Sequence, residues 1–286
     1  MEKEKNKVAL LSVIAAFFLT AFKLIIGILT GSLGILSEAL HSGLDFIAAV
    51  ITWFSVRISD KPADENHHFG HGKVENLSAF IETILLLITC VWIIYEAISR
   101  LISGNTHIEV NIWSYVVVIT SIVIDISRSK ALNRVAKKYK SQALEADALH
   151  FSTDIWSSCV VLIGLICANF NIYIADSIAA LMVAVIVIWV SFKLGKRSIN
   201  VLLDRVPDDN YVIIKNIMDN VHEITSYHDL KIRAAGADIF VNVNIHVDSE
   251  LNIVETHNIA NKIEQKINSL IERCEIHIHV EPDGKE

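Results

Sequence analysis

The stretch "EALHSGLD", residues 38–45, lies inside a run of apolar sequence long enough to cross a membrane. A close copy, "DALHFSTD", occupies residues 147–154. Both stretches read acid-Ala-Leu-His, then three residues, then Asp. Ionisable side chains within an apolar span are costly, and they usually mark a site for an ion or a substrate. The repeat therefore predicts an intramembrane site built from two matching pieces.

The composition around this repeat is that of a membrane protein. The chain has 286 residues, of which 52% are apolar, and its mean hydropathy is +0.46. Long apolar runs fill residues 1–200, whereas residues 206–286 alternate polar and apolar positions. This pattern favours a polytopic membrane domain followed by a small soluble domain. The net charge of −7 argues against a nucleic-acid partner. Cys90, Cys159, Cys167 and Cys274 form no C-x-x-C pair, which favours packing roles over a disulfide framework.

A bilayer core needs about 20 apolar residues in a helix. The segments of sufficient length are 8–29, 33–57, 77–102, 112–128, 144–169 and 173–195. The first is longer than a signal-peptide core and is expected to remain uncleaved. The fourth is short and ends near Asp125, which a helix continuing through "SRSKALNRVAKKYK" would explain. We therefore expect an all-α domain of six spans over residues 1–205.

Positive charge sets the orientation of such spans. Lys and Arg gather before the first span, between spans two and three, and after spans four and six. The remaining loops, "TGS", "SGNTHIEVN" and "ANFNIY", are nearly free of them. We expect a multi-pass protein of the cell (plasma or inner) membrane with both termini in the cytoplasm. The two motif copies then lie on antiparallel helices, as in transporters with inverted elements around a midplane site.

Residues four apart share one helix face, so His41 projects with Asp45 and His150 with Asp154. Together they supply two imidazoles and two carboxylates, a tetrahedral set that suits Zn²⁺. Two ionised aspartates at helix centres cost about 5–7 kcal/mol, which a divalent cation or protons would offset. The alternative is that the histidines are buried groups bonded to neighbouring helices.

Other ionisable groups in the spans are less clear from sequence. Glu38 either faces the same cavity or is solvated or paired with another helix. Lys23 is expected to extend its amine toward the outer surface. Glu82, Glu96 and Asp176 have no evident partner in the sequence.

The loop between spans two and three reads "SDKPADENHHFGHGKVEN". Asp64, His67 and His71 are spaced to gather on one turn, with His68 as a spare. Histidine and carboxylate together favour a second zinc site, exposed to the cytoplasm. A polar loop that happens to contain histidines is the alternative.

Residues 206–286 predict a cytoplasmic α+β domain of order α-β-β-α-β, a ferredoxin-like arrangement also found in metallochaperones. In "VNVNIHVD" and "IHIHVEP" the histidines fall on the polar phase of the strands. A metal cluster is one reading of the exposed side, and inert surface histidines are the other. The candidate ligands are His228, His246, His257, His279 and Glu281, with His277 as a further one.

Taken together, these features resemble the cation diffusion facilitator (cation efflux) family of divalent-metal transporters, in its zinc-type form. The resemblance rests on HxxxD in spans two and five, the "PADENHHFGHGKVE" loop, "LLDRVPDD" after span six, and the α-β-β-α-β tail. It covers nearly the whole chain.

The resemblance implies a homodimeric, proton-coupled exporter that works by alternating access. It implies a transport site at His41, Asp45, His150 and Asp154, the loop site named above, and a binuclear site in the tail. Many relatives have Asp where this chain has Glu281. Lys73 and Asp204 look like the family's charged pair near the membrane edge, an interlock between protomers.

Several functions compete with Zn²⁺/H⁺ antiport. A membrane metalloenzyme is disfavoured, because no H-E-x-x-H motif occurs and four protein ligands leave no position for a catalytic water. A metal sensor would bind without transporting. The same transporter could carry Fe²⁺, Co²⁺, Cd²⁺ or Mn²⁺, since ligand type alone does not fix selectivity.

Overall fold

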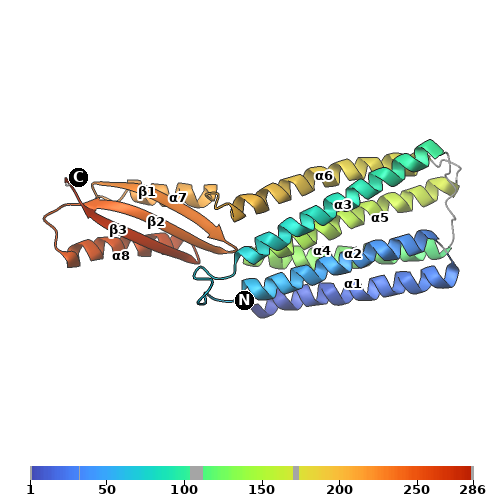
Figure 1. Cartoon of the computed structure of the whole chain (residues 1–286), viewed down its shortest axis with the longest axis horizontal. Coiled ribbons are helices and arrows are strands. Elements are labelled where there is room, and N and C mark those ends of the chain that lie inside the picture. Colours follow the sequence, from blue (N-terminus) through green and yellow to red (C-terminus); the bar gives the residue numbers. More distant parts are fainter. Residues whose placement is uncertain (1, 32, 104–111, 170–173, 285–286) are drawn as a thin grey trace. The chain divides into compact units, whose positions relative to one another are not determined.

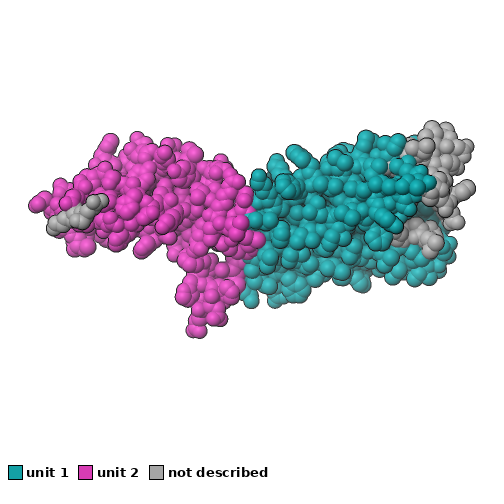
Figure 2. Space-filling model, turned by 45° about the horizontal axis from the view of Figure 1, so that its top comes forward, with its two compact units in different colours: residues 1–61, 74–199 teal, residues 62–73, 200–286 magenta. Residues whose placement is uncertain are grey.

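The computed structural model describes residues 2–31, 33–103, 112–169 and 174–284. Two compact units divide it: residues 1–61 with 74–199, and residues 62–73 with 200–286 (Figure 2). The histidine-rich loop thus groups with the C-terminal residues. The boundary expected between residues 205 and 206 remains a prediction.

The first unit is built from six long helices (Figure 1). They are α1 (Glu2–Thr30), α2 (Leu33–Ser59), α3 (Lys73–Ser103), α4 (Ile112–Tyr139), α5 (Gln142–Asn169) and α6 (Ile174–Leu202). As expected from the sequence, α4 runs unbroken from its apolar part through the basic segment to Tyr139. Among the described residues, helices α1 to α4 are long and apolar enough to cross a membrane. Six crossings stay a prediction, and the outer loops 103–111 and 168–173 lie mainly outside the described residues.

The helices α1, α2, α4 and α5 form one packed group. Helix α1 contacts α2 and α4, and α5 contacts α2 and α4. Their shared core contains Ala9, Val56, Leu132, Leu144 and Phe151. This packing makes α2 and α5, which carry the two motif copies, direct neighbours.

Helix α3 packs against α6 and α5. Leu86 and Cys90 of α3 meet Val187 of α6 in one apolar cluster. A second cluster joins Ala79 of α3 to Ala146 of α5. These side-chain contacts bring the polar groups beside them into the same interior layer.

Polar groups lie inside this unit and large apolar ones outside. Thr52, Glu82 and Asp147 are wholly buried, whereas Phe18 and Trp92 are about two-thirds exposed, at 66% and 69%. Wholly buried acidic groups together with large exposed apolar side chains are unusual in a water-soluble protein. An apolar outer surface fits a lipid environment, and buried polar groups there are usually functional.

The second unit contains the predicted α-β-β-α-β order. Its elements are α7 (Asp208–Asp219), β1 (Ser226–Ala235), β2 (Asp238–Val247), α8 (Ile253–Leu270) and β3 (Cys274–Pro282). The sheet order is β1-β2-β3, with β1 antiparallel and β3 parallel to β2 (Figure 1). A crossover helix, α8, makes the parallel pairing possible.

One face of this sheet is covered and the other is polar. Val241, Val243 and Ile245 of β2 are buried with Ile263 and Ile267 of α8. The intervening β2 positions point away from this core, since successive side chains of a strand alternate between faces. The strand register then lines up the predicted histidines, because His228 and His279 both pair with Asn244 and Glu281 pairs with His246.

The loop 62–73 packs against the polar face. The Phe69 ring meets the Phe240 ring edge-on, with centroids 5.2 Å apart. The Arg233 guanidinium lies 3.8 Å from the Phe69 ring centroid. Gly72 is in such close contact with the Ala235 carbonyl that a Cβ would collide with it. The loop is therefore held against β1 and β2 by specific contacts.

Candidate metal centres

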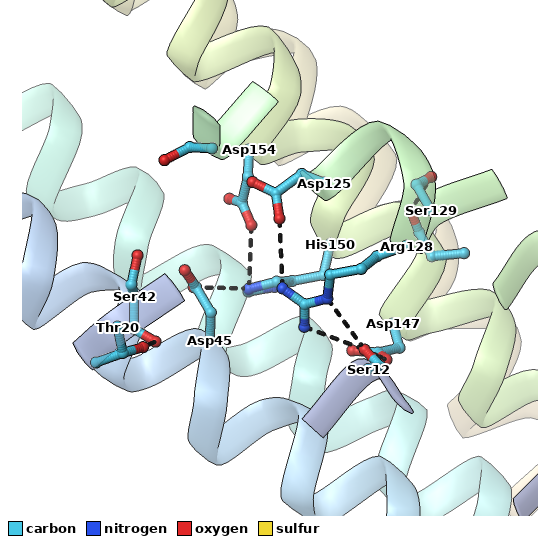
Figure 3. Close-up of polar contacts among 12 residues, drawn as sticks. Ser12, Thr20, Ser42, Asp45, Asp125, Arg128, Ser129, Asp147, His150 and Asp154 are labelled. Carbon is cyan, nitrogen blue, oxygen red and sulfur yellow. Dashed lines mark hydrogen bonds and ion pairs between the residues drawn. The ribbon is translucent and has the colours of Figure 1, made fainter. Parts of the chain in front are cut away.

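The two motif copies meet at the interface between α2 and α5 (Figure 3). His41 and Asp45 project from one face of α2, and His150 and Asp154 from one face of α5. His150 Nε2 lies 3.0 Å from Asp45 Oδ1 and 3.6 Å from Asp154 Oδ2. His41 Nε2 lies 3.9 Å from Asp45 Oδ1 and 3.7 Å from Asp154 Oδ1. Each imidazole thus faces both carboxylates.

These spacings are close to those of a four-ligand metal site. Zinc bonds of about 2.0–2.1 Å in a tetrahedron separate the ligand atoms by about 3.3 Å. The four histidine–aspartate distances lie between 3.0 and 3.9 Å. Ligand atoms of His41, Asp45 and Asp154 all lie within 4.8 Å of one another, a grouping compatible with a shared ion. His150 is not part of that group of three, but it approaches Asp45 Oδ1 and the second oxygen of Asp154. We call these four residues the membrane cluster.

The membrane cluster is buried on one side and more open on the other. The side chain of His150 is 3% exposed, while that of His41 is 30% exposed. His150 Nδ1 is buried and has no hydrogen-bond partner among the described residues.

Further charged groups surround the membrane cluster, and the sequence alone did not pair them. The Arg128 side chain bonds Asp125 at 3.3 Å and the Ser12 hydroxyl at 3.1 Å (Figure 3). Its guanidinium also lies 3.4 Å from the centre of the Phe151 ring. This contact braces α4 against α5 next to His150.

Lys23 does not extend to the outer surface, contrary to expectation. It is 4% exposed, and its amine donates to Glu38 at 3.1 Å and to Ser42 at 2.8 Å. The Lys23 amine on α1 stays inside because Glu38 and Ser42 on α2 lie within hydrogen-bond distance, and an adjacent carboxylate stabilises a buried amine. Glu38 is therefore paired with another helix. Comparing the polar residues on the facing sides of α1 and α2 could have predicted this pair from the sequence.

The loop gathers its three predicted ligands. Asp64 lies 3.3 Å from His67 Nδ1 and 3.4 Å from His71 Nε2. Its carboxylate also accepts hydrogen bonds from the backbone N–H groups of Asn66 and His67, and these bonds lower the pKa of Asp64. His68 instead contacts the Glu65 carbonyl. We call Asp64, His67 and His71 the loop cluster.

In the tail, Glu281 lies at the centre of a second histidine group. Its carboxylate is 3.3 Å from His228, 3.5 Å from His246 and 3.6 Å from His279. Asn244, which the sequence did not single out, donates to the same carboxylate at 3.1 Å. His228, His246 and Glu281 have ligand atoms within 4.8 Å of one another, whereas His279 approaches the other oxygen of Glu281. We call these four residues the tail cluster.

Two other predicted tail ligands lie elsewhere within the chain. His257 is exposed on α8 and belongs to no group of three potential ligands among the described residues. His277 lies by register beside Asn242, where it lines a shallow cavity with Lys231 and Glu275. Strand alternation correctly predicted that His277 lies on the polar face of the sheet. It is two residues before His279 on β3 and lies outside the tail cluster.

Lys73 and Asp204 form the ion pair that the resemblance implied. Lys73 Nζ lies 2.8 Å from Asp204 Oδ1, and Arg233 approaches the other oxygen at 3.9 Å. The pair joins the start of α3 to the segment after α6. Their side chains are 33% and 45% exposed, so solvent weakens the attraction.

Comparisons with known proteins cover nearly the whole chain. Residues 9–203 match the family model described as the cation efflux transmembrane domain, and residues 206–283 match the cytoplasmic domain of cation efflux proteins. The uncharacterized transporter MJ0449 of Methanocaldococcus jannaschii is 34% identical over 97% of this chain and 99% of its own. The manganese efflux system protein MneS of Bacillus subtilis is 29% identical over 98% and 96%.

A solved structure matches the tail alone. The metal-bound C-terminal domain of the CzcD transporter from Thermotoga maritima is 27% identical. The match covers 27% of this chain and 91% of that one, with a TM-score of 0.26.

Proposed function

The chain belongs to the cation diffusion facilitator (cation efflux) family of metal transporters, and from this membership we propose that it is a Zn²⁺/H⁺ antiporter that exports zinc from the cytoplasm. The observation that carries the proposal is the membrane cluster. Two imidazoles and two carboxylates face one another across α2 and α5 at 3.0 to 3.9 Å. This donor set favours zinc over ions that prefer oxygen alone.

Proton exchange follows from the chemistry of the ligands. Imidazole and carboxylate bind a metal only when deprotonated, so zinc binding releases protons. In the proposed cycle the deprotonated cluster takes zinc from the cytoplasm. After the helices expose it to the other side, protons compete for the same atoms and zinc leaves. Alternating access thereby couples one flux to the other.

The arrangement in the membrane completes this proposal. Six spans over residues 1–205 place both termini in the cytoplasm of a cell (plasma or inner) membrane protein, as the Lys and Arg distribution favours. Residues 206–286 form the cytoplasmic domain. The loop and tail clusters then bind cytoplasmic zinc. In a homodimer, metal in the tails draws the two copies together, and the pair of Lys73 and Asp204 supports the junction.

Manganese is the second candidate cargo, because a relative of similar length is a manganese efflux protein. The histidines of the membrane cluster argue for zinc instead, since manganese favours oxygen ligands. Fe²⁺, Cd²⁺ and Co²⁺ accept the same donors. A metal sensor would contain the same clusters and bind metal, but it would not transport metal across the membrane.

The test is cation uptake into sealed proteoliposomes with an imposed pH gradient. Zn²⁺, Mn²⁺, Fe²⁺, Co²⁺ and Cd²⁺ are compared at equal concentration. We expect gradient-driven uptake with zinc preferred, and its loss when the gradient is collapsed. Binding of zinc without uptake would identify a sensor, and preferred uptake of manganese would establish the second cargo.

A further inference from the structure

Among the described residues, two buried carboxyl groups outside the membrane cluster form no ion pair within 4 Å. Of the buried acidic side chains that the structure describes, Asp45, Glu75 and Asp125 each lie within 4 Å of a histidine, lysine or arginine. Glu82 and Asp147 are also wholly buried. Within the described part of the chain, neither has such a partner.

Hydroxyl groups reach only one oxygen of each carboxyl. Thr52 and Ser78 both donate to Glu82 Oε1. Ser12 donates to Asp147 Oδ2 at 3.3 Å. The other oxygens, Glu82 Oε2 and Asp147 Oδ1, have no hydrogen-bond partner among the described residues. A carboxyl group can hold a proton on an oxygen that no donor reaches.

The two groups lie at the same level of the bundle. Asn76 of α3 bonds Gln142 of α5 at 2.6 Å, and Ala79 packs with Ala146 one turn further along. Glu82 follows Ala79 by three residues, and Asp147 directly follows Ala146. The two carboxyls also interact electrostatically with each other and with His150.

The first acids of the two motif copies differ in their partners. Glu38 and Asp147 are the first residues of the two copies, each one turn before its histidine. Because α2 and α5 run in opposite directions, the two acids lie on opposite sides of the membrane cluster. Glu38 has the Lys23 amine as its partner. Within the described residues Asp147 accepts a bond from a hydroxyl alone, and the Arg128 guanidinium is bonded to Asp125 and Ser12.

We propose that Glu82, together with Asp147, is a proton-binding site separate from the membrane cluster, on the side of the cluster toward the first residues of α3 and α5. A neutral carboxyl is far less costly to bury than an unpaired carboxylate. A dication at the cluster adds positive charge nearby and favours the ionised form. The O–H bond of Glu82 then breaks, and its proton passes to water at that end of the bundle.

This inference rests on the proposed function and adds a second source of exchanged protons to it. The charged or titratable groups facing the pair are His150 on α5, Arg128 on α4 and Asp154 on α5. From α1 and α2 the described neighbours are the hydroxyls of Ser12 and Thr52, which do not titrate in this range.

The experiment counts the protons released per chain when zinc saturates the purified full chain, by calorimetry in buffers of different ionisation enthalpy. Glu82→Gln keeps the acceptor for Thr52 and cannot release a proton. We expect it to release about one proton fewer than the wild type. Glu96→Gln, on the exposed face of the same helix, is the control and keeps the wild-type count. An unchanged count in Glu82→Gln overturns the inference.

A second measurement does not depend on how the variant folds. Infrared difference spectra of wild-type protein, recorded with and without zinc, show whether a protonated carboxylic acid is lost on binding. We expect such a loss, and a smaller one in Asp147→Asn. A wild-type spectrum without it also overturns the inference. If the wild type takes up zinc but Glu82→Gln releases as many protons as the wild type, the proposed function stands and this inference falls. If Glu82→Gln releases one proton fewer but the wild type takes up no zinc, the inference stands and the proposed function falls.

Discussion

At the residue scale, the chemistry depends on which atoms share each carboxylate. Asp45 and Asp154 each face both histidines of the membrane cluster, whereas Glu281 faces three histidines of the tail cluster. A carboxylate in such a position binds metal directly and also balances its charge. Removing such a carboxylate should therefore lower metal affinity more than removing a neighbouring hydrogen-bond donor.

The first prediction concerns Asp154. Replacing it with Asn keeps the size of the side chain but removes the charge. Loss of even an indirect partner of a ligand costs about 10–100-fold in metal affinity. We expect Asp154→Asn to weaken zinc binding at the membrane cluster by at least about 100-fold, as measured by equilibrium binding. Glu96→Gln should bind as the wild type does, and equal affinity in both variants would exclude Asp154 as a ligand.

The second prediction concerns the turn that holds the loop cluster. Backbone N–H groups bond the Asp64 carboxylate and lower its pKa. The bonds therefore stabilise the turn fully above the unfolded pKa of about 3.9, and this stabilisation is lost as the pH falls through the lower folded pKa. The amide shift of His67 should report a transition below about pH 3.9.

Two variants separate the charge of Asp64 from its hydrogen bonds. In Asp64→Asn the amide oxygen still accepts the bonds, so the turn should persist without that transition while zinc affinity falls. In Asp64→Ala both are lost. If Asp64→Ala left the His67 amide shift unchanged, the carboxylate would not be what orders the turn.

At the element scale, glycines decide how closely helices approach. A Cβ on Gly195 of α6 would lie 2.8 Å from Cγ2 of Thr83 on α3, and the Thr83 side chain is held by a bond to the Ala79 carbonyl. A Cβ on Gly43 of α2 would meet nothing within 4 Å. The same substitution should thus have opposite effects in the two helices.

The third prediction is this contrast. Gly195→Ala should destabilise the protein by about 1–3 kcal/mol through overpacking. Gly43→Ala should stabilise α2 by up to about 1 kcal/mol, because alanine loses less backbone entropy. Unfolding in detergent micelles measures both. Destabilisation by Gly43→Ala, or none by Gly195→Ala, would contradict the packing of these helices.

At the scale of the whole molecule, each unit has its own core and its own candidate metal ligands. The first contains the membrane cluster, and the second contains the loop and tail clusters. Ligand binding stabilises the unit that contains the site. Zinc should therefore raise the unfolding temperature of each unit. A ligand mutation in one unit should reduce the rise in that unit and leave the rise in the other unchanged.

The fourth prediction tests this separation in the tail. Glu281→Gln removes the charge shared by three histidines and should abolish most of the zinc-induced rise in the unfolding temperature of the second unit. Scanning calorimetry with and without zinc measures it. Glu272→Gln, outside the described ligand groups, should retain the full rise. A full rise in Glu281→Gln would show that the tail cluster is not a zinc site.

Sequence periodicity was enough to predict much of this molecule. Four-residue spacing placed His41 with Asp45 and His150 with Asp154, and strand alternation placed His246, His277 and His279 on one face. Both are local rules of helix and strand geometry. Pairings between distant elements were not predictable in this way. Lys23 with Glu38, and Asn244 with Glu281, depend on which helices pack and in which strand register.

The most direct test of the central claim is X-ray absorption at the zinc edge. The protein carries His67→Ala and Glu281→Gln, so that the loop and tail clusters are disabled and only the membrane cluster remains. We predict one bound zinc with four nitrogen or oxygen ligands at about 2.0–2.1 Å and an imidazole signature. A six-oxygen shell, or zinc retained unchanged after Asp154→Asn, would contradict a zinc site formed by His41, Asp45, His150 and Asp154.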